Sequence, residues 1–352
     1  MSIQRFEGFD HFASEADLAA KGMMPGSTST WTYLGGQYAG NAIVGNAATD
    51  VLVVPYVTAV TESTVGFWLY LAAAPGAAAT ILEFHSSDTS LTNPHLSVKV
   101  NTNLSLEVFR DGATSIAASG ASAIATTAWT FVEMSALINN VTGAYELKLN
   151  ESSLLSGGAI NTSSSVSSDY AVDSIRLLGA ATMEPRFDDL VIVDTTVAGS
   201  EPITFTGKIT VATLWPSADG ALSQFTGVGT GSANYDRVDE KPGKDDDTSY
   251  VQTTTVGNRD LYNFDDIPGG YAGLSTILAV QTSAAVRKAQ PGTKEVRTNI
   301  RSSATDANGS NVELTAGYKY TPAQIEATDP NTAAAWTTSG VNALQAGIEV
   351  MT

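Results

Sequence analysis

The sequence predicts an all-β protein made of two antiparallel β-sandwich domains in tandem. Apolar and polar side chains alternate along most segments, and this period of two indicates strands with one buried face. Helical periodicity is nearly absent, and clusters of Gly, Asn and Ser separate the segments. The length of 352 residues exceeds what one ordinary core needs, so two domains are expected.

The first domain is predicted from a series of short strands. Residues 64–71 (TVGFWLYL) form an apolar run, which predicts a fully buried strand around Trp68. Residues 129–138 and 144–150 flank the turn sequence NNVTG, so they are expected to pair as a hairpin. The alternation in residues 97–109 (SVKVNTNLSLEVF) predicts a single strand. Its buried face carries Val98, Val100, Leu104, Leu106 and Val108.

Two more strands and one short helix complete this domain. The strands are predicted at residues 173–179 (DSIRLLG) and 186–194 (RFDDLVIVD). Ser14 and Asp17 have the spacing of a capping box, and Gly22 follows the segment LAAK, which predicts a short helix between them.

A domain boundary is predicted where the strand that ends at Asp194 gives way to small and polar residues and Pro202. The domains are therefore expected at residues 1–197 and 203–352. The second is predicted to be a smaller sandwich. Its expected strands lie within residues 248–256, 272–283, 294–303 and 311–320.

Composition and charge narrow the classes of function. The chain carries 36 acidic against 18 basic residues, a net charge of −18, which argues against nucleic acid as a partner. No run of apolar residues is long enough to span a membrane, and the N-terminal residues MSIQRFEGFDHF do not resemble a secretory signal. There is no cysteine, so no disulfides are expected, which fits but does not prove folding in a reducing cytosol.

Catalytic patterns are missing, and we predict that the protein is not an enzyme. No Gly-x-Ser-x-Gly elbow occurs, and His11 stands beside an acid that it cannot orient without tertiary help. His85 and His95 flank a polar loop, but ten residues of loose spacing predict no metal site. Asp188 and Asp189 are adjacent and are expected on opposite faces of a strand. We therefore predict no catalytic, cofactor-binding or metal-binding residues and no cofactor.

An acidic segment, residues 239–247 (DEKPGKDDD), allows two interpretations. A calcium loop would need acids at alternating positions and a closing Glu, which this order does not provide. The favoured interpretation is a solvated turn between two strands that keeps a sheet edge from pairing with other chains.

Several segments resemble virion structural proteins of tailed bacteriophages. RFEGFDHF, FDDLVIVD, LWPSADGALSQFTG, the stretch YDRVDEKPGKDDDTSYVQ with DLYNFDDI after it, and the ending DPNTAAAWTTSGVNALQAGIEV are similar to segments of that family. Phe225 and Phe12 stand where the family has Trp and Tyr. The resemblance implies a concanavalin-like or laminin-G-like sandwich of the jelly-roll kind followed by a second β domain.

The same resemblance implies a non-enzymatic tail, neck, head-fibre or decoration protein that is assembled in the host cytoplasm and resides in the virion. The expected partners are capsid, neck or tail proteins and sister copies, with a host-surface glycan as a further partner. An alternative function is that of a free-standing carbohydrate-binding, lectin-like module.

The C-terminal run is the candidate interface for assembly, because it ends the chain with apolar residues and little charge. The residues proposed for it are Trp336, Val341, Leu344, Ile348 and Val350. The alternative for this run is that it forms the final strand of the second sandwich. Trp68 and Trp129 are predicted in the core of the first sandwich, and Trp336 is predicted to anchor the second.

Overall fold

The chain is all-β, with every recorded strand pair antiparallel, in a computed structural model that describes residues 2–86, 93–196, 205–271 and 276–352. It divides into two units. The first comprises Met1–Ala19 and Met23–Val211, and the second comprises Ala20–Gly22 and Ala212–Thr352. Residues 205–211, which the sequence assigned to the second domain, therefore group with the first unit. No helix among the described residues is long and apolar enough to cross a membrane.

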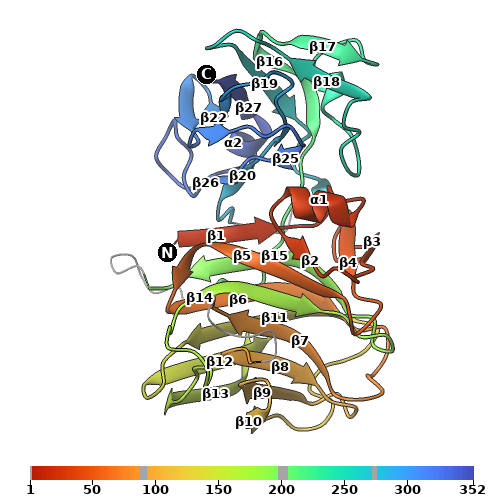
Figure 1. Ribbon diagram of the computed structural model, residues 1–352, viewed down its shortest axis with the longest axis vertical. Coiled ribbons are helices and arrows are strands. Elements are labelled where there is room, and N and C mark those ends of the chain that lie inside the picture. Colours follow the sequence, from red (N-terminus) through yellow and green to blue (C-terminus); the bar gives the residue numbers. More distant parts are fainter. Residues whose placement is uncertain (1, 87–92, 197–204, 272–275) are drawn as a thin grey trace. The chain divides into compact units, whose positions relative to one another are not determined.

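The first unit is a sandwich of an eight-stranded and a seven-stranded sheet (Figure 1). The larger sheet has the order β13 (Ser152–Ile160), β12 (Gly143–Leu149), β11 (Trp129–Leu137), β6 (Glu62–Tyr70), β15 (Arg186–Asp194), β4 (Asn41–Val44) and β3 (Thr32–Gly35), with β1 (Ser2–Glu7) also paired to β15. The smaller sheet has the order β10 (Thr114–Ala118), β9 (Leu106–Arg110), β8 (Leu96–Val100), β7 (Ala79–His85), β14 (Val172–Leu178), β5 (Val51–Val60) and β2 (Met24–Pro25).

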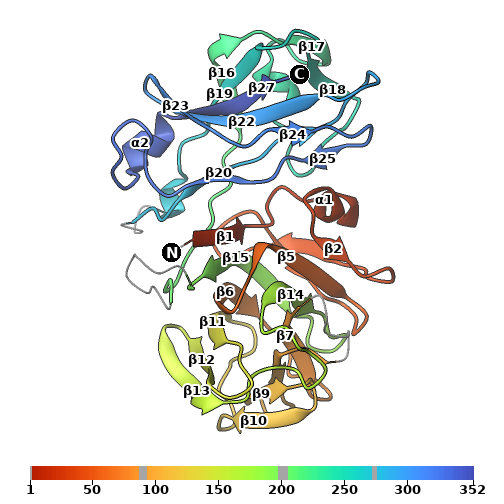
Figure 2. The same cartoon turned by 60° about the vertical axis from the view of Figure 1, so that its left-hand side comes forward.

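The core of this unit lies between the two sheets. Alternate side chains of each strand point into it, as the period of two predicts. Val132 and Met134 of β11 meet Leu82 and Phe84 of β7 in one continuous apolar cluster. Figure 2 shows the two layers of strands that enclose this cluster. The opposite, outer faces of both sheets are thereby left for polar and aromatic residues.

The predicted hairpin is confirmed, and its turn is set by an asparagine. β11 and β12 pair in register, with Met134 opposite Leu147. The Asn139 side chain accepts hydrogen bonds from the backbone N–H groups of Val141 and Thr142 at 2.8 and 2.9 Å. This local turn brings the two strands together.

The predicted single strand at residues 97–109 is wrong, because the segment folds as two strands, β8 and β9, joined by a turn. The turn forms because the Asn103 side chain accepts from the N–H of Ser105 at 3.1 Å and Leu104 adopts a positive φ of 62°. Val98, Val100, Leu106 and Val108 are nevertheless buried, since Val100 and Leu106 lie opposite each other across the five-residue turn and share a face. Leu104, which was predicted on the buried face, is half-buried in the turn.

The predicted helix is confirmed as α1 (Glu15–Ala20). Ser14 Oγ accepts from the N–H of Asp17 at 3.3 Å, and the Asp17 carboxylate accepts from the N–H of Ala13 at 3.1 Å, as in a capping box. Gly22 follows with a positive φ of 80°, which ends the helix.

The second unit is built on a six-stranded sheet. Its order is β16 (Pro216–Ser223), β19 (Arg259–Phe264), β27 (Gln345–Val350), β22 (Glu295–Ser302) and β23 (Thr305–Asn308), with β24 (Val312–Glu313) also paired to β22. Three two-stranded ribbons accompany it: β17 (Thr226–Gly229) with β18 (Ser249–Gln252), β20 (Val280–Thr282) with β26 (Gln324–Glu326), and β21 (Ala285–Val286) with β25 (Lys319–Tyr320). The short helices are η1 (Tyr235–Arg237), η2 (Gly269–Tyr271) and α2 (Thr338–Asn342).

The strands expected in the second half are found in shorter form. The segments at 248–256 and 294–303 contain β18 and β22, and residues 311–320 divide into β24 and β25. The segment at 272–283 contains β20, while its residues 272–275 lie outside the described residues.

The candidate interface residues contribute to the core of the second unit. Trp336, Val341, Leu344 and Ile348 are each less than 10% exposed, and Val350 is half-buried and packs against the cluster that contains Ile348. β27 lies between β19 and β22, so the C-terminal run forms a strand within the sheet. Their apolar character is thus explained by the fold, and an assembly role for them stays a prediction that the isolated chain leaves untested.

Candidate functional site

The outer face of the eight-stranded sheet carries two neighbouring rows of side chains. In the first row Trp129 of β11 lies opposite Tyr70 of β6, which lies opposite Arg186 of β15. In the second row, the residues in the same order of strands are Phe131, Trp68 and Asp188. Residues directly opposite each other in an antiparallel sheet share a face, so both rows point away from the core.

The aromatic side chains of these rows are in contact. The ring centroids of Tyr70 and Trp129 lie 5.5 Å apart, and those of Trp68 and Phe131 lie 5.4 Å apart. The Arg186 guanidinium lies over the Tyr70 ring, 4.6 Å from its centroid. These distances are typical of aromatic pairs and of cation–π contacts.

A segment of the chain, residues 205–211, covers the second row. Trp68 donates through Nε1 to the carbonyl of Ile209 at 2.8 Å. The N–H of Thr206 donates to Glu133 Oε1 at 2.6 Å, and the N–H of Val211 donates to Asp189 Oδ1 at 2.9 Å. We call these residues the covering segment.

The covering segment divides the face into a closed and an open row. Trp68 is only 5% exposed and Phe131 is fully buried, whereas the side chains of the first row, from Tyr70, Trp129 and Arg186, are half-buried. Tyr38, which is 44% exposed, stands edge-on to Trp68 with its centroid 6.0 Å away. The open row is therefore a solvent-facing aromatic platform with a cation at one end.

Of the three tryptophan predictions, the one for Trp129 is wrong. Trp68 is buried, but beneath the covering segment and outside the apolar cluster between the sheets. Trp129 is half-buried on the outer face, so its prediction as a core residue is wrong. The signal that could have placed it is its spacing of two and four residues from Phe131 and Glu133, which share its face. Trp336 is 4% exposed and packs in the second unit, as predicted.

Asp188 and Asp189 differ from the prediction because a β-bulge interrupts the strand between Asp188 and Val191. Asp189 adopts a positive φ of 49°, so the simple alternation of faces fails at this point. The Asp188 carboxylate accepts from the N–H of Gln37 at 2.7 Å. Both acids are buried and influence each other electrostatically.

Burial raises the pKa of three acids on this face. It raises the pKa of Asp188 to about 7, although the hydrogen bond from Gln37 acts in the opposite direction. Burial and the neighbouring charge of Asp188 raise the pKa of Asp189 to about 9. Burial also raises the pKa of Glu133, against the hydrogen bonds from Thr206. These acids hold loops and the covering segment in place through backbone amides.

The histidines are engaged separately. His85 Nε2 lies 2.9 Å from Glu83, whereas His95 contacts Ser86 and accepts at Nδ1 from the N–H of Ser164. His11 lies 3.5 Å from Glu7. Within the described ranges, no three His, Asp or Glu side chains are grouped so that they could hold a metal ion.

The acidic segment is tied to the second unit by ion pairs. Lys241 pairs with Asp265 at 3.0 Å, and Asp247 pairs with Arg287 at 2.6 Å. The Tyr318 hydroxyl lies 3.0 Å from Asp247 Oδ1, whereas Asp245 accepts from Ser249 at 2.8 Å. Neighbouring acids therefore point to different partners, and the segment is a fastened loop of the second unit.

Acids in the segments that resemble phage proteins fasten loops in the same way. Asp219 accepts from the N–H of Tyr235 at 2.7 Å. Asp260 accepts from the N–H groups of Gln224 and Phe225 at 2.5 and 2.8 Å and from the side chain of Asn234 at 2.7 Å. These residues therefore have structural roles in the second unit.

Comparisons with known proteins find only weak structural similarities. No family model matches the chain, and no curated protein matches it. Among solved structures, a Trypanosoma rangeli sialidase is 12% identical with a TM-score of 0.34, covering 46% of this chain and 27% of the sialidase. A carbohydrate-binding module from Bacillus subtilis is 13% identical with a TM-score of 0.33, covering 48% and 94%. An alginate lyase from a Chlorella virus is 10% identical with a TM-score of 0.38, covering 51% and 96%.

This chain spans about a quarter of the sialidase that it matches. At these identities and TM-scores, the similarities carry no argument about function. The function must therefore be argued from the residues of the face itself.

Proposed function

We propose that the chain is a non-enzymatic, carbohydrate-binding β-sandwich protein that forms part of a tailed-phage virion. The observation that carries the binding function is the open row on the outer face, where Tyr70 and Trp129 are in ring contact and half-buried. Aromatic rings held on a rigid sheet bury large area at low entropic cost, and the apolar faces of sugar rings can stack on them.

The virion assignment rests on the sequence resemblance, whose segments fall in both units. FDDLVIVD lies in β15, DLYNFDDI begins in β19, and GIEV ends β27. The protein would be made in the host cytoplasm and would present its first unit to the host surface.

A free-standing carbohydrate-binding module is the second candidate, because the open row would serve a soluble lectin equally well. The two candidates differ in where the protein is found. Immunogold labelling of purified particles with an antibody against the chain is expected to decorate virions. Absence of label from particles, together with glycan binding by the free protein, would favour the free module.

The binding function is tested on a glycan array with the full chain and the variant Tyr70→Ala. Loss of the ring should weaken binding by about fivefold or more, if a sugar face stacks on the ring as strongly as a nucleobase does, at about 1–3 kcal/mol. Val57→Ala, on an exposed side chain of β5 in the other sheet, is the control and should leave binding unchanged. No binding to any glycan by the folded wild-type chain would overturn the proposal.

A further inference from the structure

Two cations on the candidate face are without acidic partners. Arg186 has no side-chain hydrogen bond or ion pair to the described residues, and its Nε is buried without a partner. Lys208, in the covering segment, is exposed and lies 6.0 Å from the Trp68 ring centroid, again without a recorded ion pair in the described chain. In a protein with net charge −18, acids are abundant, so unpaired cations on one face are informative.

The two cations stand over adjacent rows. Tyr70 and Trp68 are two residues apart on β6, which corresponds to about 7 Å along a strand. Each cation lies over an aromatic ring, Arg186 over Tyr70 and Lys208 over Trp68. The face thus repeats one combination, a cation with an aromatic ring, along the strand direction.

The acids on the same face do not cancel these charges. Asp188 and Glu133 are buried, and each accepts hydrogen bonds from backbone amides. Burial raises the pKa of both, to about 7 for Asp188, which reduces the negative charge of Asp188 near neutral pH. The exposed Glu151 accepts from the backbone N–H of Lys208 at 3.5 Å, but among the described residues neither Glu151 nor the exposed Glu184 forms an ion pair with the Lys208 ammonium or with Arg186.

We propose that Arg186 and Lys208 make this face a binding site for an acidic polysaccharide, whose carboxylates they contact while its sugar rings stack on Tyr70 and Trp129. The inference rests on the proposed carbohydrate-binding function and adds the charge of the ligand. A carboxylate suits Arg186 because the planar guanidinium can donate two parallel hydrogen bonds to it.

The test compares oligogalacturonate with its methyl ester by isothermal titration calorimetry, since esterification removes the negative charge and adds only one methyl group to each carboxyl. The full chain is expected to bind the acid at least about tenfold more tightly than the ester, as charge-assisted hydrogen bonds allow. Arg186→Gln should remove most of that difference while leaving ester binding in place. Arg186→Lys should restore part of it, because the charge returns without the planar fork.

Lys208→Gln is a second test variant, and it changes an exposed side chain where Arg186→Gln changes a half-buried one. It should reduce the preference for the acid by less than Arg186→Gln does. Lys99→Gln is the matched control: Lys99 also lies over a ring, that of Phe109 at 3.8 Å, but on the outer face of the other sheet. It should leave the preference unchanged. Thermal unfolding of each variant verifies that it is folded.

The outcomes separate the two proposals. Equal binding of acid and ester by the folded wild-type chain would overturn the acidic ligand while leaving carbohydrate binding in place. Tighter binding of dextran sulfate than of oligogalacturonate would overturn the assignment to carboxylates. Absence of binding to acid, ester and every glycan of the array would overturn the proposed function itself.

Discussion

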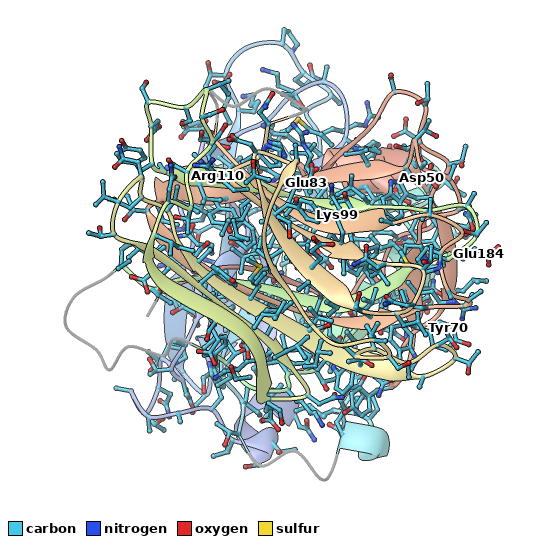
Figure 3. The ribbon with its side chains drawn as sticks, turned by 90° about the horizontal axis from the view of Figure 1, so that it is seen from below. Asp50, Tyr70, Glu83, Lys99, Arg110 and Glu184 are labelled. Carbon is cyan, nitrogen blue, oxygen red and sulfur yellow. The ribbon has the colours of Figure 1, made fainter. Side chains whose placement is uncertain are left out.

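Arg176 and Arg186, on the two outer faces of the first sandwich, differ in whether an acid lies beside them. On the seven-stranded sheet, Arg176 of β14 lies directly opposite Glu83 of β7, with 3.8 Å between Nη1 and Oε2, and His85 approaches the same carboxylate. Lys99 donates to the carbonyl of Gly112 at 2.7 Å. On the eight-stranded sheet, Arg186 has no such partner. Figure 3 labels residues of both sheets, with Glu83 and Lys99 on one and Tyr70 on the other.

The difference separates residues that serve the fold from residues that are available to a ligand. An ion pair between residues that lie opposite each other on two strands stabilises the sheet, and this explains why both charges are present. A cation stacked on a half-buried ring, without an acid beside it, has no equivalent explanation in the chain. Substitutions on each face and in each row test whether these differences change the free energy of unfolding.

The largest effect is expected from the tryptophans of the two rows. Trp68→Ala should lower the free energy of unfolding by about 3–5 kcal/mol, because it removes a buried indole and the bond to Ile209. Trp129→Ala should cost about 1 kcal/mol or less, because that ring is half-buried on the open row. Urea denaturation followed by far-UV circular dichroism measures both. Equal losses would mean that the rows do not differ in burial.

A smaller effect is expected from the two arginines. Arg176→Gln should lower the free energy of unfolding by about 1–3 kcal/mol, because it leaves the buried Glu83 carboxylate with one cationic neighbour fewer. Arg186→Gln should lower it by no more than about 0.5–1 kcal/mol, since only the cation–π contact with Tyr70 is lost and no ion pair. The same urea denaturation measures the free energy of unfolding of both variants. A larger loss for Arg186 than for Arg176 would show that the unpaired arginine is needed by the fold.

The alternation of apolar residues was sufficient to predict most of the fold. β6, β11, β12, β14 and β15 lie where the pattern places them, because each buries one face in the same core. The turn at Asn103 and Leu104 was missed because the alternation of apolar and polar residues continues through it, so the hairpin resembles one long strand. Element boundaries depend on such local side-chain hydrogen bonds, which the alternation does not report.

The candidate face was hidden from the sequence for a different reason. β11 and β6 carry apolar residues on both faces, so the spacing of Trp129 from Glu133 is the main signal in β11 that separates Trp129 on the outside from Met134 in the core. The covering segment is remote in sequence from Trp68, and only tertiary structure shows that it lies on the sheet. The unpaired state of Arg186 likewise depends on which acids the fold brings near it.

The acids under the covering segment lead to a pH-dependent prediction for the closed row. The pKa of Asp189 is about 9 in the folded chain, against 3.8 as the ordinary value, so the folded state keeps a proton that the unfolded state releases. The stabilisation is complete below about pH 4 and is lost as the pH rises toward 9. Asp188, whose pKa is about 7, acts in the same direction over the lower part of this range.

Asp189→Asn removes this titration while keeping a carbonyl oxygen that can accept from the N–H of Val211. Between pH 5 and pH 8, the variant should lose less unfolding free energy than the wild type by at least about 1.4 kcal/mol, the equivalent of one pKa unit. Urea denaturation at several pH values measures this, with Asp169→Asn, in an exposed loop, as the matched control that should follow the wild type. If the variant and the wild type lose stability in parallel, Asp189 is ionised in the folded chain. In that case a charged carboxylate would bind the N–H of Val211 in the covering segment. The closed row would then contain a buried charge and would be no less polar than the open row.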